Sequence, residues 1–172
     1  SRGIPENVAN KIYDDMIDFA KYAFNKSHAA AYAVVAYQTA WLKYYYPVEF
    51  MAALMTSVQD NTAKVSEYIL TCRQMGIGIL PPDINEGYSG FTVSGDSIRY
   101  GLSAIKSVGR SVVEQIIKER ENGGLFRSMD DFVERMSNKE VNKRTLENFI
   151  KAGALDSLPG NRRQKCMVAP EM

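Results

Sequence analysis

The sequence predicts a mainly α-helical protein, with one helical lobe before a short β-hairpin and a second helical lobe after it. Apolar residues recur every three or four positions before residue 75 and again after residue 110, which is the spacing of one helix face. Between these regions, glycines and prolines at 76–90 interrupt the helical pattern. Short runs typical of strands follow at 91–93 and 98–100, and the "SGDS" between them predicts the turn of a β-hairpin.

The composition restricts the kind of binding site that the chain can carry. Its 172 residues include 21 lysines and arginines and 20 aspartates and glutamates, so an anion site must be local. Cys72 and Cys166 are far apart and lack C-x-x-C spacing, which favours a reducing compartment over a zinc site or a disulfide scaffold. The sequence opens without a charged-then-apolar leader, so we expect no signal peptide. We also expect the chain to be a piece of a longer protein.

The first helix is predicted at 5–23, because Pro5 suits a first helical turn and the apolar residues that follow share one face. We expect that face to be buried, and its residues are Val8, Ile12, Met16, Phe19 and Ala23.

The second helix is predicted at 27–46, with Ser27 as its N-cap and Pro47 directly after its end. Residues 27–42 contain no lysine, arginine, aspartate or glutamate. This run is shorter than the roughly 20 apolar residues of a membrane span, and it includes polar side chains. We therefore expect a buried helix at the centre of its lobe.

The remaining segments predict shorter elements. Pro47 opens a third helix, "DNT" at 60–62 caps a fourth, and Gly76 suits the position after that helix. The expected helices before the hairpin are at 47–58 and from the cap at 60–62 to Gly76. The β-hairpin is expected at 91–93 and 98–100, and the helices after it are expected at 110–121, 128–136 and 143–153. We expect the tail after Leu158 to be loosely ordered or a cut end.

Residues 104–120, "AIKSVGRSVVEQIIKER", contain a candidate anion site. A short apolar helix end meets a tight turn at 107–109, and a new helix begins near Arg110. The first N–H groups of that helix have no partner within the helix, and Lys106 and Arg110 flank them. We therefore expect a DNA phosphate to bind here, in contact with Val108 and Gly109. Such a contact does not read the base sequence. Replacing Gly109 is expected to disturb the turn, since glycine tolerates positive φ.

This turn resembles a helix-hairpin-helix motif, in which Gly–hydrophobic–Gly is usual, although Ser107 replaces the first glycine. A second, more degenerate copy is predicted at 138–158, with a basic cluster at Lys139, Lys143 and Arg144. Two copies would hold two nearby phosphates. The alternative is an ordinary helical hairpin whose charges are only solvated.

The chain's one histidine lies in a second candidate anion site, formed by Lys26, Ser27 and His28. A helix start carries partial positive charge, and a lysine and a histidine there would strengthen a phosphate pocket. The alternative is that Ser27 only caps the helix. We expect no metal site, because the acidic pairs at 14–15 and 130–131 lie in helical patterns where adjacent side chains diverge.

The longest motif is "FNKSHAAAYAVVAYQTAWLKYYYPVEFMAALMTS", and agreement continues through "DNTAKVSEYILTCRQMGIGILPPDIN", "YGLSAIKSVG" and "GALDSL". These residues resemble the C-family of bacterial replicative DNA polymerases, the alpha subunits of DNA polymerase III. The resemblance covers roughly residues 3–165. It is to the form found in Gram-negative bacteria rather than to the Gram-positive type with an inserted exonuclease.

The resemblance implies the division of the chain and its ligands. It places residues 1–85 in the polymerase fingers, 86–102 in a linker and β-hairpin, 103–158 in a tandem helix-hairpin-helix region, and 159–172 in a tail. The implied ligands are primer-template DNA and a deoxynucleoside triphosphate, whose phosphates would meet Lys26, Ser27 and His28. Tyr32 and Gln38 would lie near the template or the next helical turn.

The resemblance also implies what other parts of such an enzyme supply. Mg²⁺ and the catalytic aspartates belong to the palm, so we expect no cofactor in this fragment and no polymerase activity from it alone. Contacts with the sliding clamp and the clamp loader belong to regions not present here. The expected location is the bacterial cytoplasm, at the nucleoid-associated replisome, with no membrane partner.

Two alternatives to a polymerase fragment remain from the sequence. One is a free-standing helix-hairpin-helix module of a repair protein, and the other is a helical interaction domain without a ligand. Salt-sensitive duplex binding separates these two alternatives.

Overall fold

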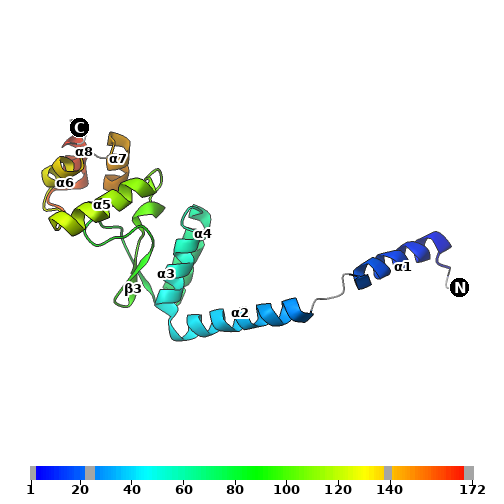
Figure 1. The fold of residues 1–172 in the computed structure, drawn as a ribbon. Helices are drawn as coiled ribbons and strands as arrows, with labels where there is room; N and C mark the ends of the chain where they lie inside the picture. The colour runs from blue at the N-terminus through cyan, green and yellow to red at the C-terminus, as the bar shows by residue number, and fades with distance from the viewer. Residues whose placement is uncertain (1–2, 22–25, 138–140, 169–172) are drawn as a thin grey trace. The chain divides into compact units, whose positions relative to one another are not determined.

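The structure is a computed structural model that describes residues 3–21, 26–137 and 141–168 (Figure 1). Its Cα positions group into two compact units, residues 1–44 and residues 45–172, and each is described by itself. The elements confirm the predicted mainly α fold with a short β-hairpin. They are α1 (Glu6–Lys21), α2 (Lys26–Tyr45), α3 (Pro47–Ser57), α4 (Thr62–Gln74), β1 (Gly78–Leu80), β2 (Thr92–Ser94), β3 (Ser97–Arg99), the 3₁₀ helix η1 (Leu102–Ala104), α5 (Arg110–Gly123), α6 (Met129–Met136), α7 (Lys143–Ala152) and α8 (Arg162–Val168).

The first unit contains α1 and nearly all of α2, and both helices lie where the sequence predicts them. Their predicted burial is wrong for the described residues. The apolar face of α1 ranges from 43% exposed at Val8 to 76% exposed at Phe19, and no residue of α2 is buried. Ala23 lies outside the described residues. Two helices alone cannot enclose an apolar surface that extends around α2, so Tyr37 and Trp41 stay exposed. None of the described helices combines the length and apolar character of a membrane span.

The second unit begins with α3 and α4, whose ends follow the predicted signals. Pro47 occupies the first turn of α3. The Asn61 side chain caps α4 by accepting a hydrogen bond from the Lys64 N–H, and Gly76 adopts a φ of 76° just after the helix. Cys72 of α4 is fully buried against Met55 of α3, and this burial raises the pKa of the thiol.

The predicted β-hairpin is confirmed, and it belongs to a slightly larger sheet. Strands β2 and β3 pair antiparallel with Ser94 opposite Ser97, so Gly95 and Asp96 form a two-residue loop. Gly95 adopts the positive φ, 60°, that such a loop requires. Strand β1 pairs with β3 in parallel, which gives the order β1-β3-β2. The sequence did not predict β1, because three residues are too few to show an alternating pattern.

The segment after β1 is fastened to the helices of the same unit. Ile84 donates its N–H to the Ala154 carbonyl at 2.9 Å. Asn85 and Phe126 exchange two hydrogen bonds of 2.9 Å each, one in each direction. Arg120 of α5 is buried and donates from Nη1 to the carbonyls of Ile84 and Gly87, again at 2.9 Å. The Gly/Pro-rich stretch is therefore an anchored connection.

Helices α5 to α8 gather around one apolar core (Figure 1). Its members include Val112, Val113, Ile116, Phe132, Met136, Leu146, Phe149, Ile150, Leu155 and Leu158. Helix α8 corrects the expectation of a loose tail after Leu158. It is held by Lys165, which is only 2% exposed and donates to the carbonyls of Leu155 at 2.7 Å and Leu158 at 2.8 Å. Pairing of this kind makes a buried ammonium group acceptable and fixes a short helix that helical periodicity does not reveal.

Replacing Lys165 with methionine should therefore destabilise the second unit. The variant keeps most of the side-chain volume but leaves buried carbonyls without their donor, at a cost of about 1–3 kcal/mol. Urea unfolding followed by circular dichroism measures the change. Arg163→Met is the matched control, since Arg163 is exposed on the same helix, and it should stay within about 0.5 kcal/mol of the wild type. Equal stability of the two variants would show that the Lys165 hydrogen bonds do not hold α8.

Candidate nucleic-acid interface

The loop between η1 and α5, residues 105–109, is called here the hairpin turn. Its two apolar residues anchor it, because Ile105 is 8% and Val108 is 9% exposed and both belong to the helical core. The Val108 N–H donates to the Ile105 carbonyl at 3.2 Å, which closes a four-residue turn. Lys106 and Ser107, at the two central positions, are therefore exposed. The predicted turn and the start of the next helix at Arg110 are confirmed.

The special backbone position of the hairpin turn is Ser107 and not Gly109. Ser107 has a φ of 61° and is the one non-glycine residue with positive φ in the described part of the chain. It occupies the third turn position, where type II turns require positive φ and usually have glycine. Gly109 has a φ of −74° and a ψ of 144°, which any residue adopts. The expectation that Gly109 needs positive φ is wrong, because the first position of the Gly–hydrophobic–Gly pattern carries that demand.

Gly109 instead leaves the start of α5 open. It is the N-cap residue, and no side chain makes a cap hydrogen bond there. A Cβ at this position would meet Ser111 Oγ at 3.7 Å and Val112 Cγ2 at 4.0 Å, which are ordinary contacts. Packing therefore does not require a glycine at this position. Because Gly109 has no side chain, an anion has direct access to backbone N–H groups at the positive end of the helix dipole.

The two cations predicted for this site flank the open helix start. Lys106 and Arg110 are both exposed. Within the described part of the chain neither side chain has a hydrogen bond or an ion pair. Their charges are therefore available to a ligand, and a phosphate beside Gly109 would lie near both.

The second predicted copy differs from the first in two respects. Helix α7 does begin at Lys143, and Lys143 and Arg144 are exposed. Its N-terminus is capped from within, because Asn142 Oδ1 accepts a hydrogen bond from the Thr145 N–H at 2.9 Å. Lys139 lies outside the described residues. A phosphate at Lys143 and Arg144 would therefore be bound mainly by these two side chains, because Asn142 already occupies a backbone N–H group at the helix start.

The helix–turn–helix of this copy spans α7 and α8, residues 143–168, and so extends beyond the predicted limit at 158. Its turn is closed from inside by the Lys165 ammonium group. Arg162, the first residue of α8, forms an exposed ion pair with Asp156, and these hydrogen bonds lower the pKa of the Asp156 carboxyl. The second copy thus has the same topology as the first, but the Lys165 ammonium group binds the carbonyls of its turn.

The structure places Lys26, Ser27 and His28 in the first turn of α2, and all three are exposed. Ser27 lies inside the helix, so the N-cap expected at this residue is wrong, and residue 25 is outside the described part. The His28 and Tyr32 rings lie one turn apart, with centroids 4.4 Å from each other. The geometry leaves the phosphate role of these residues a prediction.

The acidic pairs lie on helices, as expected. Asp14 and Asp15 are exposed on α1. Asp131 accepts a hydrogen bond from the Arg127 N–H at 2.8 Å and lies 3.5 Å from Arg135 Nη1. Within the described residues, no three or more histidine, cysteine, aspartate or glutamate side chains lie together in a way that could hold a metal ion.

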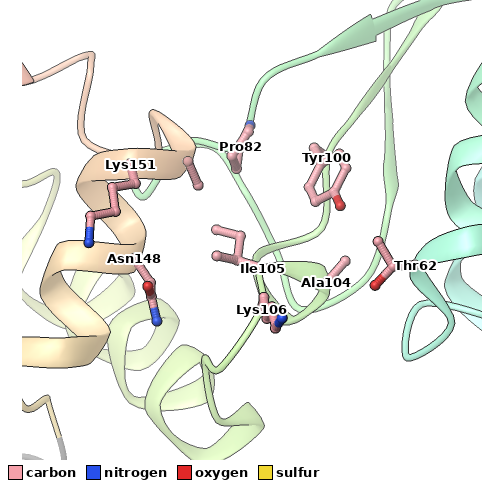
Figure 2. A pocket seen from close by; sticks show the side chains of 9 residues that line it. Thr62, Pro82, Tyr100, Ala104, Ile105, Lys106, Asn148 and Lys151 are labelled. Atoms are coloured by element: carbon pink, nitrogen blue, oxygen red, sulfur yellow. The ribbon is translucent and has the colours of Figure 1, made fainter.

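The sequence did not reveal a hollow beside the hairpin turn (Figure 2). Its volume is about 480 Å³, and its walls come from α4, the segments around β3 and η1, and α7. The lining residues are Thr62, Pro82, Tyr100, Ala104, Ile105, Lys106, Asn148, Lys151 and Ala152. They are spread over ninety positions of sequence, so no local motif could have brought them together.

A family model described as a helix-hairpin-helix motif matches residues 76–165. The match takes in both turns, the three-stranded sheet and the connecting helices, and it covers slightly more than half of the chain. This chain belongs to the helix-hairpin-helix family.

Its relatives are more specific. The chain is 48% identical over 169 residues to the DNA polymerase III subunit alpha of Thermus aquaticus, which is 98% of this chain and 14% of that protein. It is 50% identical over 163 residues to the protein of the same name from Deinococcus radiodurans, covering 95% of this chain and 12% of the relative. The Escherichia coli K12 subunit is 51% identical over 161 residues, with 93% and 14% covered. The resemblance to the alpha subunits is confirmed, and the chain spans about one seventh of their length.

The exchange of backbone roles in the hairpin turn predicts that neither of two substitutions, one to glycine and one from glycine, lowers the stability of the chain. Ser107→Gly should stabilise the chain by about 0.5–1 kcal/mol, because it relieves a left-handed conformation that disfavours a Cβ and loses part of that gain to the flexibility of glycine. Gly109→Ala should be neutral or stabilising by up to about 1 kcal/mol. Thermal and urea unfolding measure both changes. A loss of stability in Gly109→Ala together with a loss in Ser107→Gly would contradict this assignment.

Proposed function

We propose that this chain is part of a bacterial replicative DNA polymerase and that its hairpin turn holds duplex DNA by the sugar-phosphate backbone. The observation that carries the proposal is the uncapped start of α5, with Gly109 bare and with Lys106 and Arg110 exposed beside it. Family membership and the alpha-subunit relatives support DNA as the ligand. The DNA-directed polymerase activity belongs to the whole enzyme, and the fragment alone is inactive under this proposal.

The extent of the similarity favours a polymerase over a free-standing repair module. The helix-hairpin-helix model begins at residue 76, whereas similarity to the alpha subunits covers up to 98% of the chain. It therefore includes most of α1 to α4, which a bare hairpin module does not require. The same proposal makes the rest of the polymerase chain the immediate partner. It places the sliding clamp, the clamp loader and the bacterial cytoplasmic replisome around that enzyme.

The proposed grip on DNA is electrostatic and independent of sequence. A phosphate oxygen at the start of α5 would accept hydrogen bonds from backbone N–H groups, while Lys106 and Arg110 balance its charge. The anchored Ile105 and Val108 keep the turn in place without a ligand, so little ordering is needed on binding. Lys143 and Arg144 would contact a second phosphate through their side chains. No base edge is read by such contacts, as a replicative enzyme requires.

Duplex binding by the chain tests this proposal. The affinity for a blunt duplex should fall with salt, and Lys106→Ala or Arg110→Ala should each lower the magnitude of the salt slope by about 1. Gly109→Val should weaken binding by about tenfold while keeping the fold, because its side chain covers the N–H groups. Fluorescence anisotropy across a salt series measures these effects.

Lys118→Ala serves as the control, since it removes one exposed charge from the same helix two turns further along. It should change affinity much less than Lys106→Ala. Equal effects of the two lysine variants, or full affinity in Gly109→Val, would mean that the start of α5 is not the contact.

A second contact is proposed for the incoming nucleotide. Lys26, Ser27 and His28 lie together in the first turn of α2, where a triphosphate would meet one cation, one hydroxyl group and one imidazole near the positive end of a 20-residue helix. Mg²⁺ would be supplied with the palm of the whole enzyme. The three residues orient the phosphates in this account, and they take no part in bond formation.

In a complete polymerase that contains this region, Lys26→Ala should lower kcat/KM for nucleotide incorporation by about tenfold or more, because a charge-assisted contact is lost. Single-turnover incorporation at varied nucleotide concentration measures it. Lys43→Ala, in the last turn of the same helix, is the control and should keep the wild-type value. An unchanged kcat/KM for Lys26→Ala would remove Lys26 from the nucleotide site.

A further inference from the structure

We propose that the hollow beside the hairpin turn binds one unpaired nucleotide of a single-stranded DNA segment. This inference rests on the proposed function, because it adds a single-strand contact next to the duplex contact. The hollow lies wholly within the second unit, between α4, η1 and α7 (Figure 2). Its volume of about 480 Å³ is in the range of small-ligand sites.

The floor of the hollow suits a base and its sugar. It is formed by apolar side chains and by the ring of Tyr100, and Figure 2 shows Tyr100 and Ile105 between Asn148 on one side and Thr62 on the other. Tyr100 is half-buried, its ring packs edge-on against Phe91 at a centroid distance of 4.8 Å, and burial raises the pKa of its phenol. A fixed aromatic ring is the kind of surface on which an unpaired base stacks. A paired base inside a duplex has no access to such a floor.

The rim of the hollow suits a phosphodiester. Lys106 and Lys151 both line it, and none of the nine lining residues is acidic. Lys106 has no ion pair within the described residues. Lys151 contacts Glu147 at 3.1 Å on the surface of α7, and Figure 2 shows its ammonium group turned away from the other lining side chains. An exposed pair of this kind is weak enough for the lysine to turn toward a phosphate instead. Asn148 and Thr62 add hydrogen-bonding groups on opposite walls.

A second hollow of about 530 Å³ extends the first along the hairpin turn. The two share Thr62, Ala104, Ile105 and Lys106. The extension includes Gln59, which is 7% exposed and whose buried Oε1 has no hydrogen-bond partner in the described residues. Leaving such an acceptor unpaired costs about 1–3 kcal/mol. Rotation of this amide would offer both a donor and an acceptor to a nucleobase edge, which is the chemistry that amides use on bases.

The two lysines and the Tyr100 ring of the first hollow thus match one unit of a single strand, whose neighbouring base would lie toward Gln59. The second hollow is also lined by Asp60, so the phosphate between the two bases is expected on the Lys106 side. A free mononucleotide has the base, sugar and phosphate of one nucleotide of the strand, but it lacks the phosphate of the neighbouring nucleotide. The structure therefore favours a strand over a mononucleotide, and the two sources are separated by experiment.

The test compares a labelled single-stranded oligonucleotide with a blunt duplex of the same sequence, using fluorescence anisotropy on the 172-residue chain. Lys151→Ala should weaken single-strand binding by about tenfold and change duplex binding by less than about twofold. Thr62→Phe, which fills the hollow from an exposed position, should have the same selective effect. Arg163→Ala removes an exposed charge outside the hollow and should change neither affinity. Circular dichroism confirms that each variant is folded.

Three results would overturn the proposal: wild-type single-strand affinity in both hollow variants, equal losses for single strand and duplex, or competition by thymidine monophosphate as effective as that by the oligonucleotide. Cross-linking gives an independent readout without a variant. An oligonucleotide that contains 5-iododeoxyuridine should photo-cross-link to Tyr100, as mapped by mass spectrometry, and cross-links confined to other parts of the chain would oppose the site. Single-strand binding with no duplex binding would refute the hairpin-turn proposal alone.

Discussion

The buried guanidinium group of Arg120 determines how the second unit is assembled. It lies in the last turn of α5 and donates to the carbonyls of Ile84 and Gly87, and its charge lies 4.9 Å from the centre of the Tyr88 ring. Buried carbonyls need donors, and a buried cation needs acceptors, so the loop and the helix satisfy each other. This contact ties the chain that leaves the sheet to the helix whose N-terminus forms the candidate DNA site. The direction in which that N-terminus points is therefore set from the opposite end of α5.

A common design connects the two turns of the helical lobe. Each turn is closed by a backbone hydrogen bond between apolar residues, from Val108 to Ile105 in the first and from Leu158 to Leu155 in the second. The first turn leads into an uncapped helix and leaves its polar groups facing outward. The second receives the Lys165 ammonium group from its own following helix. The same local topology thus supports a ligand site in one copy and a structural joint in the other.

Much of the fold followed from local signals in the sequence. Pro47, Asn61 and Gly76 mark helix ends by mechanisms that act over a few residues, and the structure has helix ends at each of them. The hairpin turn was predictable for the same reason. Strand β1 and helix α8 were not, since each is short and held by distant partners, β3 in one case and the carbonyls near Leu155 in the other.

The candidate site was predictable only in part. Lys106 and Arg110 adjoin a recognisable turn, but the assignment of positive φ to Gly109 failed because the motif's first position is a serine. The hollow depends on Lys151, Tyr100 and Thr62, which come together only in the folded unit. The exposure of the apolar surface of α2 was not predictable for a related reason. The residue pattern of a helix indicates which side chains favour burial, but it does not indicate which part of the protein covers them.

The burial of Lys165 has a practical consequence for chemical labelling. A reagent that acylates amines needs access to an uncharged nitrogen, and this ammonium group is both enclosed and engaged by two carbonyls. Exposed lysines such as Lys106, Lys118 and Lys143 react in the native state, whereas Lys165 reacts only when α8 opens. The extent of acylation at Lys165 therefore records how often the last helix detaches from the rest of the unit.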